Sequence, residues 1–78
     1  MNFTQKLRES RKTALLTQKN ISDKLGISER AYQHYEAGTR EPNIEILLQL
    51  SIILNLSLDE LLCREDYRQS HEAFFDEH

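Results

Sequence analysis

Cysteine, proline, glycine and tryptophan are scarce in this 78-residue chain, which has one, one, two and none of them respectively. The single cysteine, Cys63, excludes an internal disulfide. The two glycines, Gly26 and Gly38, cannot build a glycine-rich loop that cradles a phosphate. No run of about 18 apolar residues is present, so nothing in the sequence is predicted to span a membrane. The length is that of one domain with a modest core.

Side chains that bind metals or act as nucleophiles are scattered along the chain. Cys63, His34, His71 and His78 do not match the spacing of a zinc site. No Ser-His-Asp or Cys-His constellation can be read from the sequence. The first ten residues have no continuous apolar segment and are not a secretory signal. We therefore expect no metal, no cofactor and no enzymatic activity, and we expect a cytoplasmic protein.

Residues 17–38 are the most informative stretch and predict two short helices joined by a tight turn. Thr17 has a hydroxyl that can cap the free amides at the start of the first helix. Gly26 can supply the left-handed residue that closes this helix, and Ile27 then turns back into the core. Ser28 can cap the second helix as Thr17 caps the first.

The second helix, expected over residues 29–36, has an apolar and a polar face. Tyr32 and Tyr35 are three residues apart and are therefore expected to point inward together, with a base contact as the alternative for Tyr32. The side chains that fall away from this pair are acidic, basic or amide: Glu29, Arg30, Gln33 and His34. A helix with such an outer face, held by a three-residue turn, can lie in the major groove of DNA.

The distribution of charge bears on this possibility, because the formal net charge of the chain is −3. Residues 1–64 hold nine lysines and arginines against eight acids, whereas residues 65–78 hold one arginine against five acids. The acidity therefore lies in the C-terminal segment, and the remainder is near neutral. Since neutralisation of phosphates supplies most of the affinity for DNA, we expect moderate affinity from one copy of the chain.

Three further helices are expected around this central pair. The first, over residues 3–12, places Phe3, Leu7 and Arg11 on one face. Asn43 can cap a helix over residues 44–54 that is apolar on most sides and is therefore expected to be buried on most sides. Its predicted inward face consists of Ile44, Leu47, Leu48 and Leu54, and a second stripe consists of Ile46, Leu50 and Ile53. Proteins of similar sequence tend to be more polar at Ile46, Ile52 and Ile53, so we expect something to cover these three isoleucines.

The last of the expected helices begins with a capping box. Asn55 can take a left-handed conformation after the preceding helix, and residues 57–60 read Ser-Leu-Asp-Glu, in which the serine and the glutamate can cap each other's amides. Leu58, Leu61 and Leu62 are expected to pack inward from this helix.

The chain resembles the helix-turn-helix family of phage-type repressors, the Cro and lambda-repressor class often called XRE-like. The likeness covers roughly residues 3–62 and is carried by many spaced positions. These are Leu16-Thr17-Gln18, Leu25-Gly26-Ile27-Ser28, Tyr35-Glu36, Gly38, Pro42, Leu47, Leu48, Leu50, Leu54 and Ser57-Leu58-Asp59-Glu60-Leu61-Leu62. The resemblance implies an all-α bundle of five helices that binds double-stranded DNA. Similar proteins usually have glycine where Leu15 stands, and leucine disfavours positive φ, so we expect a different turn there or a longer first helix.

The candidate DNA contacts follow from the outer face of the second helix of the pair and from the resemblance. The guanidinium of Arg30 matches O6 and N7 of guanine, with a phosphate contact as the alternative. The other candidate base contacts are Glu29, Gln33 and His34. Glu29 could instead interact favourably with the dipole at the start of the helix. The candidate phosphate contacts are Thr17, Gln18, Lys19, Gly38, Thr39 and Arg40.

A structural ion pair is also implied by the resemblance. In similar repressors an arginine of the first helix bridges to the glutamate at the end of the recognition helix. Arg11 and Glu36 occupy the matching positions here. Such a pair would hold the recognition helix at its angle, and breaking it from one side costs about 3–5 kcal/mol when it is buried.

Residues 64–78 form a separate, acidic segment after a DNA-binding domain over residues 1–63. Its aromatic positions fall on one face of a sixth helix that could cover the extra isoleucines: Tyr67, His71, Phe74 and Phe75. A frayed tail is the alternative. We predict a sequence-specific DNA-binding repressor that acts as a homodimer. The alternative is an antitoxin-like or adaptor protein whose tail binds a protein partner.

Overall fold

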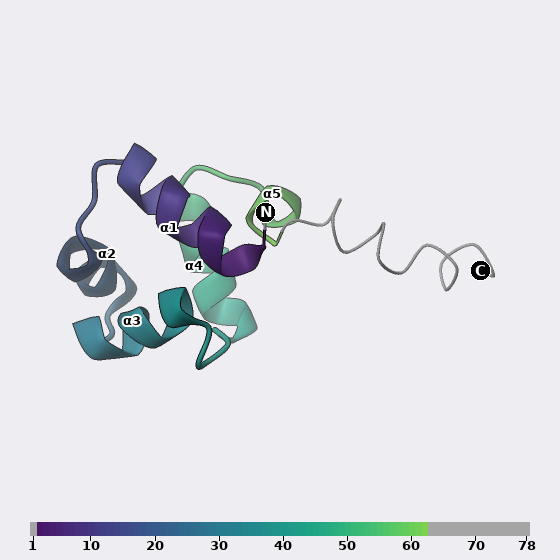
Figure 1. Ribbon diagram of the computed structural model, residues 1–78. Helices are drawn as coiled ribbons and strands as arrows, with labels where there is room; N and C mark the ends of the chain where they lie inside the picture. The colour runs from purple at the N-terminus through teal and green to yellow at the C-terminus, as the bar shows by residue number, and fades with distance from the viewer. Residues whose placement is uncertain (1, 63–78) are drawn as a thin grey trace.

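A computed structural model of the chain describes residues 2–62, and all regular secondary structure in that range is helical. Five helices follow one another with short connections (Figure 1). They are α1 (Phe3–Thr13), α2 (Gln18–Leu25), α3 (Glu29–Ala37), α4 (Ile44–Ile53) and α5 (Leu58–Leu61). The predicted all-α bundle of five helices is confirmed, with each boundary close to the predicted one. Among residues 2–62 no helix is long and apolar enough to cross a membrane.

Each helix begins where the sequence supplies a side chain that can accept from a free backbone amide. The five caps share one geometry, in which the side-chain oxygen accepts from the amide three residues later. They are Asn2, Thr17, Ser28, Asn43 and Ser57. Because these caps depend on local residues alone, the predicted helix starts agree with the structure.

Four residues with positive φ end or follow helices. Gly26 and Gly38 have φ of 71° and 79° and cap the ends of α2 and α3. Asn55 has the predicted left-handed conformation, with φ of 55°. Leu15 has φ of 60° although leucine disfavours it. Helix α1 runs only to Thr13, so the chain keeps a left-handed turn and accepts a strained leucine.

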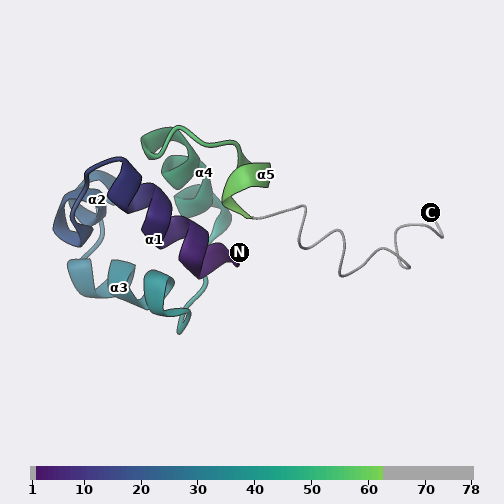
Figure 2. The ribbon, with the colours of Figure 1, turned by 45° about the horizontal axis from the view of Figure 1, so that its top comes forward.

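The core is shared by all five helices. Helix α1 packs on α3 and α5, α2 packs on α3 and α4, and α4 packs on α5 (Figure 2). Eight apolar side chains are buried between them: Leu7, Ile21, Leu25, Tyr32, Ile46, Leu50, Leu54 and Leu61. This arrangement fixes α2 and α3 against the rest of the molecule.

The predicted inward face of α4 is partly wrong. Ile44 and Leu48 are 68% and 46% exposed, whereas Ile46 and Leu50 are buried. Ile46 and Leu50 of the second stripe thus face the chain's own core, whereas Ile52, which was also expected to need a cover, is 77% exposed. A helix that is apolar nearly all round, as in IEILLQLSII, has no polar face to define its rotation. The contacts with α2 and α5 decide it instead.

The prediction for Leu62, at the end of α5, is also wrong. Leu61 is buried and Leu58 is half-buried, but Leu62, predicted to pack inward, is 43% exposed. The helix has only four residues, so it offers a single turn to the core. The predicted sixth helix, with Tyr67, lies outside the described residues.

Candidate nucleic-acid interface

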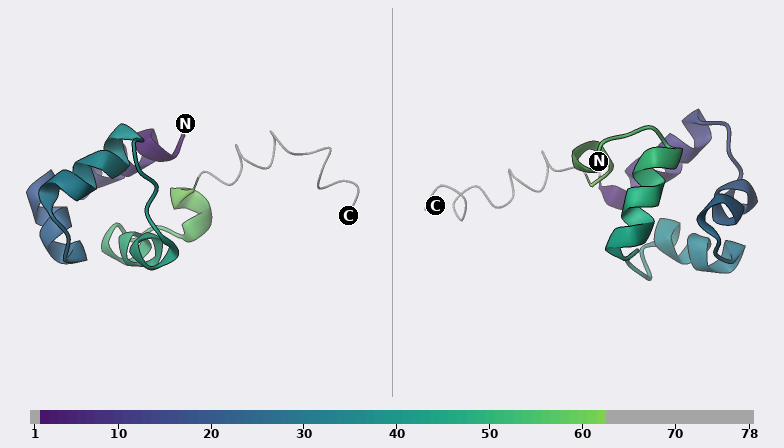
Figure 3. Two further views of the ribbon diagram at one scale, coloured as in Figure 1. Left: turned by 90° about the horizontal axis from the view of Figure 1, so that it is seen from below. Right: turned by 180° about the vertical axis from the view of Figure 1, so that it is seen from behind.

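Helices α2 and α3 are joined by the predicted tight turn. Gly26 closes α2, Ile27 packs against the core, and Ser28 begins α3. The amide of Ile27 donates to the carbonyl of Ser22 at 3.1 Å, which continues the hydrogen bonding of α2 into the turn. Viewed from below the molecule, α3 lies along one edge with its length exposed to the viewer (Figure 3, left). The turn therefore presents α3 as an accessible rod.

The two faces of α3 are those predicted from the spacing of its tyrosines. Tyr32 is fully buried and Tyr35 is half-buried, and their rings meet edge to face with centroids 6.5 Å apart. The candidate base-contacting residues lie on the other side. Glu29, Arg30 and Gln33 are exposed, and His34 is half-buried. The outer face of α3 is thus available to a partner.

The carboxylate of Glu36 lies at the centre of a polar cluster beneath this face. Glu36 is only 4% exposed. It accepts from Nε of Arg11 at 2.6 Å and from Nη2 of the same guanidinium at 3.3 Å. Arg11 also donates from Nη1 to the carbonyl of Leu16 at 2.9 Å. The ion pair expected from the resemblance is present and ties α3 to α1 and to the residue before the cap of α2.

Two further side chains donate to Glu36. The hydroxyl of Tyr32 donates to Oε2 at 2.5 Å, and Nε2 of Gln18 donates to Oε1 at 3.2 Å. Nε of Arg8 lies 3.9 Å from Oε1. One carboxylate therefore receives hydrogen bonds from side chains of α1, α2 and α3.

The contact between Tyr32 and Glu36 was missed in the sequence, where Tyr32 was interpreted as a core residue or, alternatively, as a base contact. The signal that could have revealed it is the spacing, since residues four apart on a helix are neighbours. A buried phenol also requires a hydrogen-bond partner.

These contacts fix the protonation states of the cluster. Burial raises the pKa of Glu36, but the hydrogen bonds from Arg11, Tyr32 and Gln18 outweigh it, and the net pKa lies below the ordinary value. The hydrogen bond to Glu36 raises the pKa of Arg11. Burial, followed by the hydrogen bond to Glu36, raises the pKa of the Tyr32 hydroxyl. The cluster therefore holds an ionised carboxylate, a guanidinium and a phenol that donates.

The cluster is linked to the outer face of α3 through Gln18. Oε1 of Gln18 accepts from Nε2 of Gln33 at 3.4 Å, while Nε2 of Gln18 donates to the buried Glu36. Nε2 of Gln33 also lies 3.5 Å from Oε2 of Glu29. A chain of side-chain contacts thus runs from the buried carboxylate to two of the candidate base-contacting residues.

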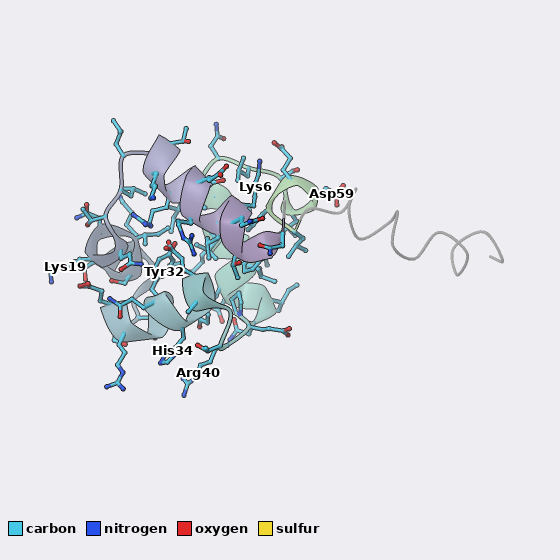
Figure 4. The ribbon with its side chains drawn as sticks, viewed as in Figure 1. Lys6, Lys19, Tyr32, His34, Arg40 and Asp59 are labelled. Carbon is cyan, nitrogen blue, oxygen red and sulfur yellow. The ribbon has the colours of Figure 1, made fainter. Side chains whose placement is uncertain are left out.

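The candidate phosphate-contacting residues lie at both ends of the α2–α3 pair. Lys19 projects from the first turn of α2, and Arg40 projects from the loop after α3 (Figure 4). Both side chains are exposed. Thr17 uses its hydroxyl as the cap of α2, accepting from the amide of Asn20 at 3.0 Å. Positive charge therefore flanks the outer face of α3 on either side.

The loop after α3 is tied to α3 by His34. Nδ1 of His34 lies 2.7 Å from Oγ1 of Thr39, and the amide of Thr39 donates to the carbonyl of His34 at 3.1 Å. Gly38 supplies the left-handed residue that allows this return. A candidate base-contacting side chain and a candidate phosphate-contacting side chain therefore hold each other in place. No group of three potential metal ligands occurs among residues 2–62.

Comparisons with known proteins agree with this geometry. A family model described as helix-turn-helix matches residues 7–61. The chain is 45% identical over 75 residues to the uncharacterized HTH-type transcriptional regulator YqaE of Bacillus subtilis, covering 96% of this chain and 62% of that protein. It is 35% identical over 73 residues to the HTH-type transcriptional regulator ImmR of the same organism, covering 94% of this chain and 58% of ImmR.

A third relative comes from a phage. The chain is 36% identical over 64 residues to the cryptic phage CTXphi transcriptional repressor RstR of Vibrio cholerae, covering 82% of this chain and 57% of RstR. The chain thus spans about three fifths of the length of these curated relatives. The matched residues include all of α2, the turn and α3, whose geometry is that of the motif. The chain belongs to the helix-turn-helix family of transcriptional regulators.

Proposed function

We propose that the chain binds double-stranded DNA sequence-specifically and acts as a transcriptional repressor. The observation that carries this proposal is the outer face of α3, where Glu29, Arg30 and Gln33 are exposed on a helix whose tyrosines point into the core. A helix presented in this way fits the major groove. The name of RstR, a phage repressor, supports repression.

Arg30 is proposed to read a guanine, because its guanidinium is exposed and projects from the first turn of α3. Gln33 and Glu29 would contact neighbouring base edges, with Gln33 oriented by Gln18. His34 is half-buried and bonded to Thr39, so it is proposed to contact the base pair nearest to that loop.

Phosphates are proposed to be held on both sides of the groove. The first turn of α2 offers Gln18, Lys19 and the cap Thr17, and a helix start favours an anion through its free amides. The loop after α3 offers Gly38, Thr39 and Arg40. Such contacts set the position of the protein on the duplex and carry no sequence information themselves.

One such domain reads only a few base pairs, so we propose a homodimer on a roughly palindromic operator. The two α3 helices would then enter half-sites about 34 Å apart. Residues 1–63 are proposed as the DNA-binding domain. The acidic residues 64–78 are proposed as a separate segment that contributes to association or binds a protein partner.

Selection of bound sequences from a random DNA pool tests this function. We expect enrichment of a consensus with two related half-sites, because specific binding exceeds non-specific binding by about 10³-fold or more. A pool that shows no enrichment after successive rounds, although the protein remains folded, would contradict sequence-specific recognition.

A further inference from the structure

Three large apolar side chains of α4 form a line on the surface. Ile44, Leu48 and Ile52 are 68%, 46% and 77% exposed, and their spacing of four residues places them on one face of the helix. We refer to these three residues as the α4 stripe. Single exposed apolar residues are normal, but a contiguous set on one element marks a contact surface. Seen from behind, α4 stands in front of the other helices (Figure 3, right).

We propose that the α4 stripe binds a second copy of this chain, with the two α4 helices packed side by side and parallel about a two-fold axis. This inference rests on the proposed function, since it names the surface by which two reading helices are brought together. The two-fold arrangement would pair Ile44, Leu48 and Ile52 each with the same residue of the partner.

The orientation of α4 relative to α3 supports the parallel arrangement. In the view from below, α4 is seen nearly end-on while α3 is seen along its length (Figure 3, left). A two-fold axis parallel to α4 therefore leaves both α3 helices on the same side of the dimer. An axis perpendicular to α4 would turn the second α3 to the opposite side, where it could not reach the same duplex. Only the parallel pairing is compatible with a palindromic operator.

The absence of charge on the α4 stripe also suits packing against the same stripe of a second copy. Around a two-fold axis each stripe residue faces its own copy, so a charged residue there would face a like charge. The stripe is uncharged, and so is Ser51, which lies on the same side of the helix. Helix α4 contains no lysine or arginine, and its single acid, Glu45, lies in the first turn, off the line of the stripe.

The size of the stripe predicts the strength of this contact. A stable interface buries about 800 Å² on each partner, which three side chains do not supply. The dimer should therefore be weak in solution. Two adjacent half-sites would hold two copies close together and raise their effective concentration, so the contact should appear as cooperative binding on DNA.

Two charged substitutions of Ile52, one acidic and one basic, test the inference directly. In sedimentation of the full chain up to millimolar concentration without DNA, we expect the wild type to self-associate. Ile52→Glu and Ile52→Lys should each weaken association on the order of 100-fold through like-charge repulsion. An equimolar mixture of the two variants should regain association, because Glu would then face Lys. Circular dichroism should show all variants folded, since Ile52 is 77% exposed.

Several results would overturn the inference. Association of each charge variant as strong as that of the wild type would place the interface elsewhere. Recovery with Ile52→Glu and Ile44→Lys, but not with the pair at position 52, would show antiparallel helices. A monomeric wild type, with Ile52→Glu losing thermal stability, would indicate that residues 63–78 of the same chain cover the stripe.

Binding to DNA separates failure of this inference from failure of the proposed function. On a duplex with one half-site, the Ile52 variants should bind like the wild type. On two half-sites they should lose cooperativity, and their mixture should regain it. If the wild type fails to bind any half-site, the proposed function is wrong, while sedimentation still decides on the interface. Unchanged cooperativity in both Ile52 variants would refute the α4 contact.

Discussion

Glu36 is a single residue on which side chains of α1, α2 and α3 converge. Its carboxylate accepts from Arg11, Gln18 and Tyr32 while only 4% of the residue is exposed. A buried charge is stable only when its hydrogen bonds are satisfied, and no buried side-chain polar atom among residues 2–62 is left unsatisfied. The angle at which α3 faces a partner therefore depends on this cluster.

Replacing Tyr32 with Phe should remove one hydrogen bond from the cluster and leave the ring in the core. Because the acceptor is charged, we expect the free energy of unfolding to fall by about 1.5–3 kcal/mol. Urea denaturation measures this change. Tyr35→Phe is a matched control on the same helix, since Tyr35 is half-buried and its hydroxyl makes no hydrogen bond to Glu36. Equal effects from the two substitutions would contradict the special role of Tyr32.

The depressed pKa of Glu36 predicts the direction of the pH dependence of stability. The folded pKa lies below the unfolded value of 4.5, so the stabilisation is present above pH 4.5 and is lost as the pH falls through the folded pKa. Glu36→Gln removes this titration. Urea unfolding from about pH 7 to about pH 3 should therefore show the wild type's advantage over the variant shrinking toward acid. If the difference in unfolding free energy between the wild type and the variant stays constant with pH, the pKa of Glu36 does not change on folding.

Arg30 and Arg40 should separate base reading from phosphate binding. Arg30→Ala should cost about 1–3 kcal/mol on the preferred site and relax specificity at one base pair. Arg40→Ala should weaken binding to all sequences alike and reduce the salt slope by about one unit. Binding isotherms on the selected site and on random DNA, at several salt concentrations, measure both effects. An equal loss on random DNA for Arg30→Ala would make that residue a phosphate contact.

At the scale of single elements, the helix starts could be predicted and the rotation of α4 could not. A cap such as Ser28 is recognised from its own side chain, and the structure places it where the sequence predicted. The inward face of α4 is decided by packing against α2 and α5, which the apolar pattern within α4 does not reveal, so Ile44 and Leu48 were assigned wrongly. The Arg11–Glu36 pair could be found only through the resemblance, because the residues are 25 apart.

The turn between α1 and α2 offers a stabilising substitution. Leu15 has φ of 60°, and 89% of it is exposed, so the side chain contributes strain and little packing. Leu15→Gly should raise the free energy of unfolding by roughly 0.5–1 kcal/mol, the relief of left-handed strain minus the entropy of the glycine. Leu15→Ala retains the Cβ and should give no comparable gain in the same thermal or urea unfolding experiment. A destabilised glycine variant would show that the leucine packs against something.

At the scale of the whole molecule, the chain separates two surfaces with different chemistry. The outer face of α3 is polar and is flanked by Lys19 and Arg40, whereas the α4 stripe is apolar and uncharged. The outer face of α3 suits a polyanion, and the α4 stripe suits the surface of another protein. Since residues 1–64 are near neutral in total, we expect DNA binding to depend on pairing two copies rather than on charge alone.

The central claim is that α3, backed by the Glu36 cluster, is the surface that meets duplex DNA. Nuclear magnetic resonance titration of the isotope-labelled chain with a duplex carrying one selected half-site tests it most directly. We predict that the largest amide shifts will fall in residues 17–20 and 29–40, with the core of α4 near Leu50 unchanged. Shifts confined to other elements, with residues 29–34 unaffected at saturation, would contradict the claim.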